Sequence, residues 1–132
     1  MRKFFAVLIL NTLALAAGSM ACAAADNVVE IVYNGTTATV SVAANISNYV
    51  TDQSNGSAHV KLVQSQNVNA SVGEITYILS GSSTDGEFYL EGSYKATVEL
   101  NGLTLTNPTG PAINLQNGKR IEVSAKTARR TR

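Results

Sequence analysis

The sequence predicts an all-β fold of stacked parallel coils, a β-solenoid, and three patterns indicate it. First, short apolar pairs recur at one spacing: they begin at Ile75, Val98 and Ile121, which lie 23 residues apart (98 − 75 and 121 − 98). Second, each pair encloses one residue of the opposite phase, as in a half-buried strand. Third, corners rich in Asn, Gly or Pro separate the short strands. A strand that returns to the same side once per coil would stack on its predecessor at about 4.8 Å.

The chain begins with an expected export signal, residues 1–25. Arg2 and Lys3 form a basic end, and the apolar run from Phe4 to Ala17 is too short to span a bilayer. Small residues follow, so that cleavage after residue 25 would leave Asp26 as the first residue of the mature chain.

An alternative end to this signal is the segment Ser19–Cys22, which resembles a loose lipoprotein motif. In that case Cys22 would be acylated and would anchor the chain to a membrane, which is the only membrane contact we expect. Either route exports the chain to the cell envelope or the extracellular space. The mature chain then has no unmodified cysteine and hence no disulfide.

The segment after the signal is expected to be an N-terminal β cap. Val28–Tyr33 and Thr37–Val42 alternate as two strands of a hairpin, Asn45–Ser57 has the composition of a loop, and Ala58–Val63 is a further strand. A solenoid needs a cap because its first coil otherwise leaves backbone groups unpaired. No linker rich in Pro or Ser follows, so residues 26–126 are assigned to one domain.

The coils themselves are expected from short apolar strands divided by corners. The strands are Ile75–Tyr77, Val98–Leu100, Leu103–Leu105, Ile113–Leu115 and Ile121–Val123. Gly and Asn at the corners accept the left-handed backbone angles that a corner needs. Asn-Gly is also the strongest two-residue hairpin signal, so a meander of hairpins is the competing interpretation. The shortness of the strands and the phase shift at each corner favour coils.

Four segments carry a family resemblance: Glu74–Gly81, Asp85–Tyr89, Val98–Asn107 and Gly110–Ile113. They resemble the carbohydrate-binding β-helix proteins whose founding member is a clostridial polygalacturonate binder, and many of whose relatives are secreted or lipid-anchored proteins of Bacteroides-type bacteria. The resemblance covers about residues 28–126. It implies a right-handed, single-stranded parallel β-helix of which about three coils are present, an acidic pectic polysaccharide as ligand, and bound calcium. It transfers no catalytic or ligand-binding motif to particular positions.

The segment 127–132 has neither alternation nor turn chemistry. A one-base deletion in codons for the Asp-Gly-Thr-Glu-Asn-Thr that is common here in the resembled family yields the Thr-Ala-Arg-Arg-Thr found at 127–131. We therefore interpret residues after about Lys126 as a frameshifted end, so that residues 26–126 are the N-terminal part of a truncated β-helix domain. The alternative is a natural basic tail.

Charge limits the class of partner. The whole chain carries +1, and removal of Arg2 and Lys3 leaves eight bases against nine acids, or −1. Without the three arginines of the tail the body carries −4 (5 − 9). A mildly acidic body with few aromatic residues argues against nucleic acid as a partner. It also disfavours simple electrostatic capture of a polyanion, so an acidic polysaccharide would need a bridging cation or a local basic patch.

Candidate metal ligands are carboxylates rather than histidines. The single histidine, His59, excludes the usual zinc sites and nucleophilic triads, and we interpret it as a hydrogen-bonded strand residue. Glu99 and Glu122 are expected to stack on successive coils, either bridged by calcium or splayed into solvent. Asp85 and Glu87, with Glu91 nearby, form either a calcium-binding loop or a polar turn.

Candidate ligand-binding residues combine an aromatic ring with cations. If Phe88 and Leu90 are core, Tyr89 faces solvent. The other candidates lie at two corners: Tyr94, Lys95, Lys119 and Arg120. Arg120 is expected near Thr97 and Glu74, where it would either hold a uronic-acid carboxylate or form ordinary ion pairs between coils. Tyr77 has the apolar phase and is expected in the core.

The function that the family resemblance implies is non-catalytic binding of an acidic, pectin-like polysaccharide, assisted by calcium. Two alternatives stay open. One is an adhesin or structural solenoid. The other is a polysaccharide lyase, because calcium-dependent pectate lyases share the architecture, although a shared fold does not confer activity. A lyase needs a strong base, which only Lys95, Lys119 or Arg120 would supply within the coils.

Overall fold

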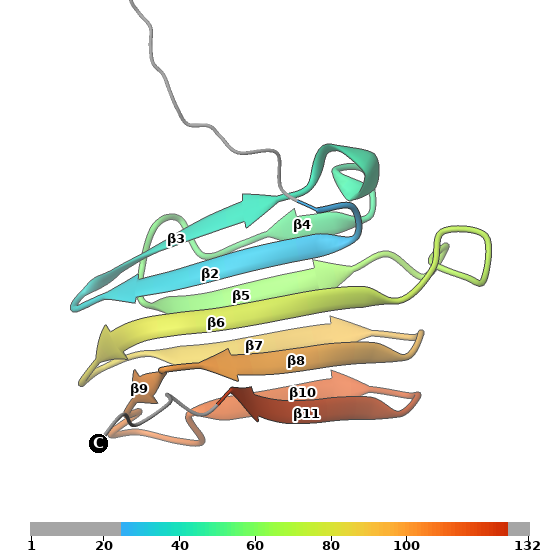
Figure 1. Ribbon diagram of the computed structural model, residues 1–132. Coiled ribbons are helices and arrows are strands. Elements are labelled where there is room, and N and C mark those ends of the chain that lie inside the picture. Colours follow the sequence, from blue (N-terminus) through green and yellow to red (C-terminus); the bar gives the residue numbers. More distant parts are fainter. Residues whose placement is uncertain (1–24, 127–132) are drawn as a thin grey trace, which may run out of the picture.

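The computed structural model of the protein describes residues 25–126, which form an all-β fold (Figure 1). The predicted all-β class is confirmed. The elements, in chain order, are β2 (Val28–Asn34), β3 (Thr37–Val42), the short 3-10 helix η1 (Ala44–Ile46), β4 (Val50–Asp52), β5 (His59–Gln64), β6 (Ile75–Ser83), β7 (Glu87–Gly92), β8 (Ala96–Asn101), β9 (Thr104–Leu105), β10 (Ile113–Asn117) and β11 (Ile121–Lys126). The expected export signal through residue 24, including Cys22, and the tail 127–132 lie outside the described residues. Between residues 25 and 126, no helix has the length and apolar character to cross a membrane.

The strands form two sheets that lie one behind the other (Figure 1). The β6 sheet has the order β11-β8-β6-β2-β3, with β9 paired to the end of β6, and the β7 sheet has the order β10-β7-β5-β4. From β5 onward the chain passes back and forth between the two sheets. Each long strand from β7 on therefore lies beside the strand that the chain formed on its previous visit to the same sheet.

The pairings between successive passes are parallel. They join β2 to β6, β6 to β8, β8 to β11, β5 to β7 and β7 to β10. Among the named strands of residues 25–126, only β2–β3 and β4–β5 pair antiparallel. A meander of antiparallel hairpins is therefore contradicted from β5 onward.

The register of the β6 sheet corrects one prediction. Ile75, Val98 and Ile121 lie on the same sheet, but Ile75 and Ile121 both face Ala96, whereas Val98 lies opposite Tyr77. The two passes differ in length, 21 residues (96 − 75) against 25 (121 − 96), because the second contains β9 and the loop that follows it. The expected single column of these three residues is therefore wrong by two positions. A shift of two keeps every side chain on its face, so all three still point inward.

The N-terminal segment contains the expected hairpin of β2 and β3. β2 is also paired in parallel with β6, so it is the first strand of the stack as well as part of the cap. The stretch 45–57, expected as loop, contains the end of η1 and β4, and Ile46 is fully buried. β3 and β4 thus add one antiparallel strand to the same end of each sheet, as Figure 1 shows at its top.

The core lies between the two sheets. The inner face of the β7 sheet carries the columns Val60–Phe88–Ile113 and Leu62–Leu90–Leu115. Facing it, Tyr77 is fully buried as expected, and its ring centre lies 6.0 Å from that of Phe88. This alternation on β5 and β7 turns the residues between the core positions outward, and those residues form the site described below.

Candidate functional site

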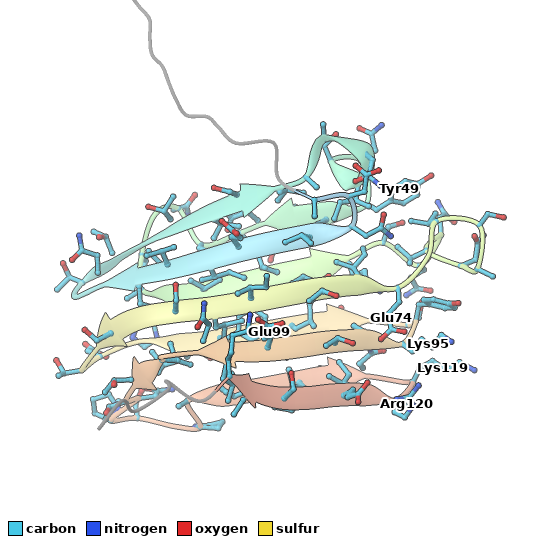
Figure 2. All side chains as sticks on the ribbon, in the orientation of Figure 1. Tyr49, Glu74, Lys95, Glu99, Lys119 and Arg120 are labelled. Carbon is cyan, nitrogen blue, oxygen red and sulfur yellow. The ribbon has the colours of Figure 1, made fainter. Side chains whose placement is uncertain are left out.

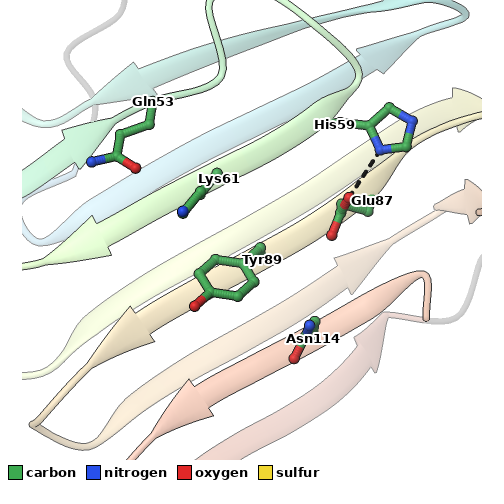
Figure 3. A pocket seen from close by; sticks show the side chains of 6 residues that line it. All are labelled: Gln53, His59, Lys61, Glu87, Tyr89 and Asn114. Atoms are coloured by element: carbon green, nitrogen blue, oxygen red, sulfur yellow. Dashed lines mark hydrogen bonds and ion pairs between the residues drawn. The ribbon is translucent and has the colours of Figure 1, made fainter. Parts of the chain in front are cut away.

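The outer face of the β7 sheet carries a column of four polar residues, which come from four neighbouring segments of the chain. Lys61 on β5 lies opposite Tyr89 on β7, and Tyr89 lies opposite Asn114 on β10. Gln53, just after β4, adds the fourth, because its backbone N–H donates to the Lys61 carbonyl over 2.8 Å. Figure 3 shows the four side chains in succession across the strands. We call Gln53, Lys61, Tyr89 and Asn114 the polar column.

The polar column lines a hollow of about 490 Å³ that is open to solvent. Two further residues complete its lining, His59 and Glu87, which lie opposite each other on β5 and β7. They form the next column along the strands, two residues before Lys61 and Tyr89. Across the strands, the hollow therefore extends over four neighbouring chain segments, from Gln53 to Asn114. Along the strands, it extends over two columns of residues.

In the middle of the polar column, the ammonium group of Lys61 lies above the aromatic ring of Tyr89. Lys61 Nζ lies 5.2 Å from the centre of the Tyr89 ring, within the range of a cation–π contact. The Tyr89 hydroxyl donates to Glu91 Oε1 over 3.0 Å, and this bond to a carboxylate raises the pKa of Tyr89. Lys61 forms no ion pair with a carboxylate of residues 25–126. Its ammonium group can therefore form an ion pair with an anion from solution.

His59 lies at one edge of the hollow, between two carboxylates. Its Nδ1 lies 2.9 Å from Glu87 Oε1 and its Nε2 lies 2.9 Å from Asp85 Oδ1; Figure 3 shows the first contact. Carboxylates only accept, and a neutral imidazole has a single N–H, so both bonds form together only with the imidazolium. The bonds to Glu87 and then to Asp85 raise the pKa of His59, against a smaller opposing effect of burial. The interpretation of His59 as a hydrogen-bonded strand residue is confirmed.

The four predicted calcium ligands do not lie together in one place. Asp85 and Glu87 are joined through His59, as described above. Glu99 lies opposite Ser124, and Glu122 lies opposite Thr97, so the expected stack of Glu99 on Glu122 is wrong. The cause is the same two-residue shift that separates Val98 from Ile121. Within residues 25–126, no group of three or more acidic, histidine or cysteine side chains is arranged to hold a metal ion.

The partners of these two glutamates are cations. Glu99 Oε2 lies 3.4 Å from Lys126 Nζ, and Glu122 Oε1 lies 3.9 Å from Arg120 Nη1. Both pairs are partly exposed, so each contributes little to stability. The alternative for Arg120 was ion pairing between coils, whereas its ion pair in the structure joins it to Glu122, two residues along the chain.

Most of the predicted ligand-binding residues lie outside the hollow. Figure 2 shows Lys95, Lys119 and Arg120 at one end of the molecule, together with Glu74. We call these three cations the basic corner. Glu74 Oε2 accepts a hydrogen bond from Thr97 Oγ1 over 2.7 Å, and Lys95 Nζ lies 5.9 Å from the centre of the Tyr94 ring. None of these residues lines the hollow.

Tyr89 is thus the predicted ligand-binding residue that the structure brings into the hollow. The polar column adds Gln53, Lys61 and Asn114, which sequence reasoning missed. The alternation of Lys61 with Val60 and Leu62 was a usable signal for an outward cation. No sequence signal placed Lys61 beside Tyr89, however, because the spacing from β5 to β7 differs from the 23 residues of the apolar pairs.

Comparisons with protein-family models, with curated proteins and with solved structures find no match to this chain.

Proposed function

We propose that this chain is a non-catalytic carbohydrate-binding protein built as a parallel β-helix, with an acidic, pectin-like polysaccharide as its ligand. The observation that carries this proposal is the polar column. It places the ring of Tyr89, the amides of Gln53 and Asn114 and the ammonium of Lys61 along one open hollow. Pyranose rings are amphipathic, so a ring face for the C–H surface and amides for the hydroxyls are complementary to them.

Support for the β-helix comes from the strand pairings. The chain alternates between two sheets, and strands from successive passes pair in parallel from β5 to β11. This is the arrangement expected of stacked coils. The family resemblance of segments 74–81, 85–89, 98–107 and 110–113 points to the same fold and to carbohydrate, and the export expected from residues 1–25 agrees with a polysaccharide outside the cell.

Support for an acidic ligand comes from Lys61. Its ammonium faces an open hollow and makes no ion pair with a carboxylate of residues 25–126. The nearest acidic residue of the lining, Glu87, is already bonded to His59. A uronic-acid carboxylate would therefore form a charge-assisted hydrogen bond with Lys61. The body of the chain is acidic overall, so recognition depends on this local group.

The experiment is isothermal calorimetry with polygalacturonate and with a neutral galactan, in the presence and absence of a chelator. We expect the chain to bind polygalacturonate, and Tyr89→Ala to weaken this binding by about tenfold, because the ring contact and its buried area are lost. Thr39→Ala, an exposed substitution on β3 in the other sheet, is the matched control. Absence of binding to polygalacturonate, or equal binding by Tyr89→Ala and the parent chain, would overturn the proposal.

A second measurement separates binding from catalysis. A lyase releases unsaturated uronides, which absorb in the ultraviolet. We expect no such release during prolonged incubation with polygalacturonate. Release that is lost in Lys95→Gln or Arg120→Gln would instead support the lyase alternative at the basic corner.

A further inference from the structure

The shape of the hollow favours one direction, relative to the strands, for a linear ligand. The polar column runs across the strands and crosses three strand intervals, which is about 14 Å at the usual spacing of about 4.8 Å. Along the strands the hollow covers only two columns, which are about 7 Å apart. One strand interval is close to the advance of an extended pyranose chain per sugar residue. The hollow is therefore long enough for about three sugars across the strands, and only one sugar wide along them.

The charges around the polar column favour the same direction. On β7 the outward residues are Glu87, Tyr89 and Glu91, so Tyr89 lies between two carboxylates. An acidic oligosaccharide laid along β7 would place its own carboxylates against those of Glu87 and Glu91. A chain that crosses β7 at Tyr89 passes between them and meets only Gln53, Lys61, Tyr89 and Asn114, none of which is acidic. Like charges in contact weaken binding, so the path across the strands is preferred.

We propose that the hollow binds a linear acidic oligosaccharide laid across the strands, with one sugar residue per strand over β5, β7 and β10. This inference rests on the proposed function and adds to it the direction and length of the ligand. The central sugar contacts Lys61 and Tyr89, and its carboxylate pairs with the Lys61 ammonium. Gln53 and Asn114 contact the sugars at the two ends.

The end residues have the groups for this role. Asn114 Oδ1 already accepts a hydrogen bond from Gln116 Nε2 over 2.7 Å, which fixes the orientation of the amide. Asn114 Nδ2 is then the atom that donates to a sugar hydroxyl or ring oxygen. At the other end, the backbone bond from Gln53 to Lys61 holds Gln53 in line with the column, and its side-chain amide lines the hollow.

The experiment is calorimetry with galacturonate oligomers from the monomer to the hexamer, on the full chain and on Gln53→Ala, Asn114→Ala and Thr51→Ala. Thr51 is the matched control, because it is exposed on β4, two residues from Gln53, and lies outside the hollow. We expect affinity to rise with length up to the trimer or tetramer and then to level off. Gln53→Ala and Asn114→Ala should each weaken binding of the tetramer by about three- to tenfold, the loss of one hydrogen bond, and leave the dimer almost unchanged.

Three results would count against the inference. A plateau already at the dimer, or tetramer affinities of Gln53→Ala and Asn114→Ala equal to that of Thr51→Ala, would overturn the direction across the strands while binding itself stands. Absence of binding to every oligomer and to polygalacturonate would overturn the proposed function, and this inference with it. Circular dichroism of each variant shows whether a loss of affinity reflects loss of fold.

Discussion

Lys61 lies directly opposite Tyr89 on the neighbouring parallel strand, with its ammonium 5.2 Å from the centre of the tyrosine ring. Both side chains point outward because the residues that flank them, Val60 and Leu62 on β5 and Phe88 and Leu90 on β7, are fully buried between the sheets. The packing of the core thus turns both groups toward the face that a ligand would meet. Because the two side chains touch the same part of the hollow, their contributions to binding should be coupled.

The first prediction concerns the charge of Lys61. Lys61→Gln should weaken binding of galacturonate oligomers by about tenfold, because an ion pair with the ammonium becomes a hydrogen bond from an uncharged amide to the carboxylate. It should also flatten the salt dependence of binding, and leave binding of the corresponding neutral galactose oligomers unchanged. Calorimetry at two salt concentrations measures both effects.

The control for this prediction is Lys119→Gln, which removes the same charge from the basic corner. It should change affinity by less than about twofold, since long-range effects of exposed charges are screened. A larger loss in Lys119→Gln than in Lys61→Gln would mean that the basic corner, and not the hollow, holds the carboxylate.

The second prediction concerns pH. Hydrogen bonds to Glu87 and Asp85 raise the pKa of His59 in the folded chain above its ordinary value of 6.5. The folded state therefore holds this proton more tightly than the unfolded state. The bridge stabilises the fold fully below about pH 6.5 and is lost as the pH rises through the raised pKa. The free energy of unfolding by urea should thus fall across this range in the parent chain more steeply than in His59→Gln.

The comparison between the two chains cancels the titration of groups that do not contact His59. Glu87→Gln is a second control, because it replaces one of the two carboxylate acceptors by a neutral amide and should lower the pKa of His59 toward its ordinary value. Parallel stability curves for the parent chain and His59→Gln, or a His59 pKa at or below 6.5 by NMR, would contradict the bridge.

The third prediction concerns a polar pair inside the core. The Tyr77 hydroxyl donates to Gln64 Oε1 over 2.6 Å, and Gln64 Nε2 is buried without a partner among the described residues. Tyr77→Phe leaves the whole Gln64 amide unpaired, so it should lower the free energy of unfolding by about 1–3 kcal/mol. The double variant Tyr77→Phe with Gln64→Leu should recover most of that loss, because no polar group is then left buried. Equal stabilities of the single and double variants would show that the Gln64 amide finds another partner.

The fold was predictable from the sequence as far as local pattern carries the information. The alternation of Ile75, Tyr77 and Val98 identified the inward face, and Asn-Gly and Pro marked the corners. The register was not predictable, because it depends on how many residues each corner consumes, and the corner with β9 is longer than the others. The polar column was missed for the same reason. Tyr89 was found from its own strand, whereas its neighbours Lys61 and Asn114 come from strands whose alignment only the fold supplies.

The fourth prediction compares two glycines with similar backbone angles. Gly81 (φ +87°) and Gly35 (φ +71°) both adopt a conformation that residues with a side chain rarely take. A Cβ at Gly81 would collide with the backbone of Tyr33 on β2, whereas one at Gly35 meets open space. Gly35→Ala should therefore cost about 1–2 kcal/mol of unfolding free energy from backbone strain alone. Gly81→Ala should cost clearly more, because β2 and β6 must separate. Urea denaturation gives both values, and equal losses would show that β2 moves freely away from β6.

The last prediction concerns the edge formed by β10 and β11, whose outer sides pair with no other strand of residues 25–126. Val123 and Val98 lie opposite each other in one inward column, yet Val123 is 51% exposed whereas Val98 is fully buried. Exposed apolar strands with unpaired backbone groups associate readily. Val123→Thr should therefore reduce self-association in analytical ultracentrifugation and change the unfolding free energy by less than about 0.5 kcal/mol. Val98→Thr makes the same chemical change in the core and should destabilise the fold by about 1–3 kcal/mol, because it buries a hydroxyl. Self-association that Val123→Thr leaves unchanged, or equal losses of stability in the two variants, would contradict this prediction.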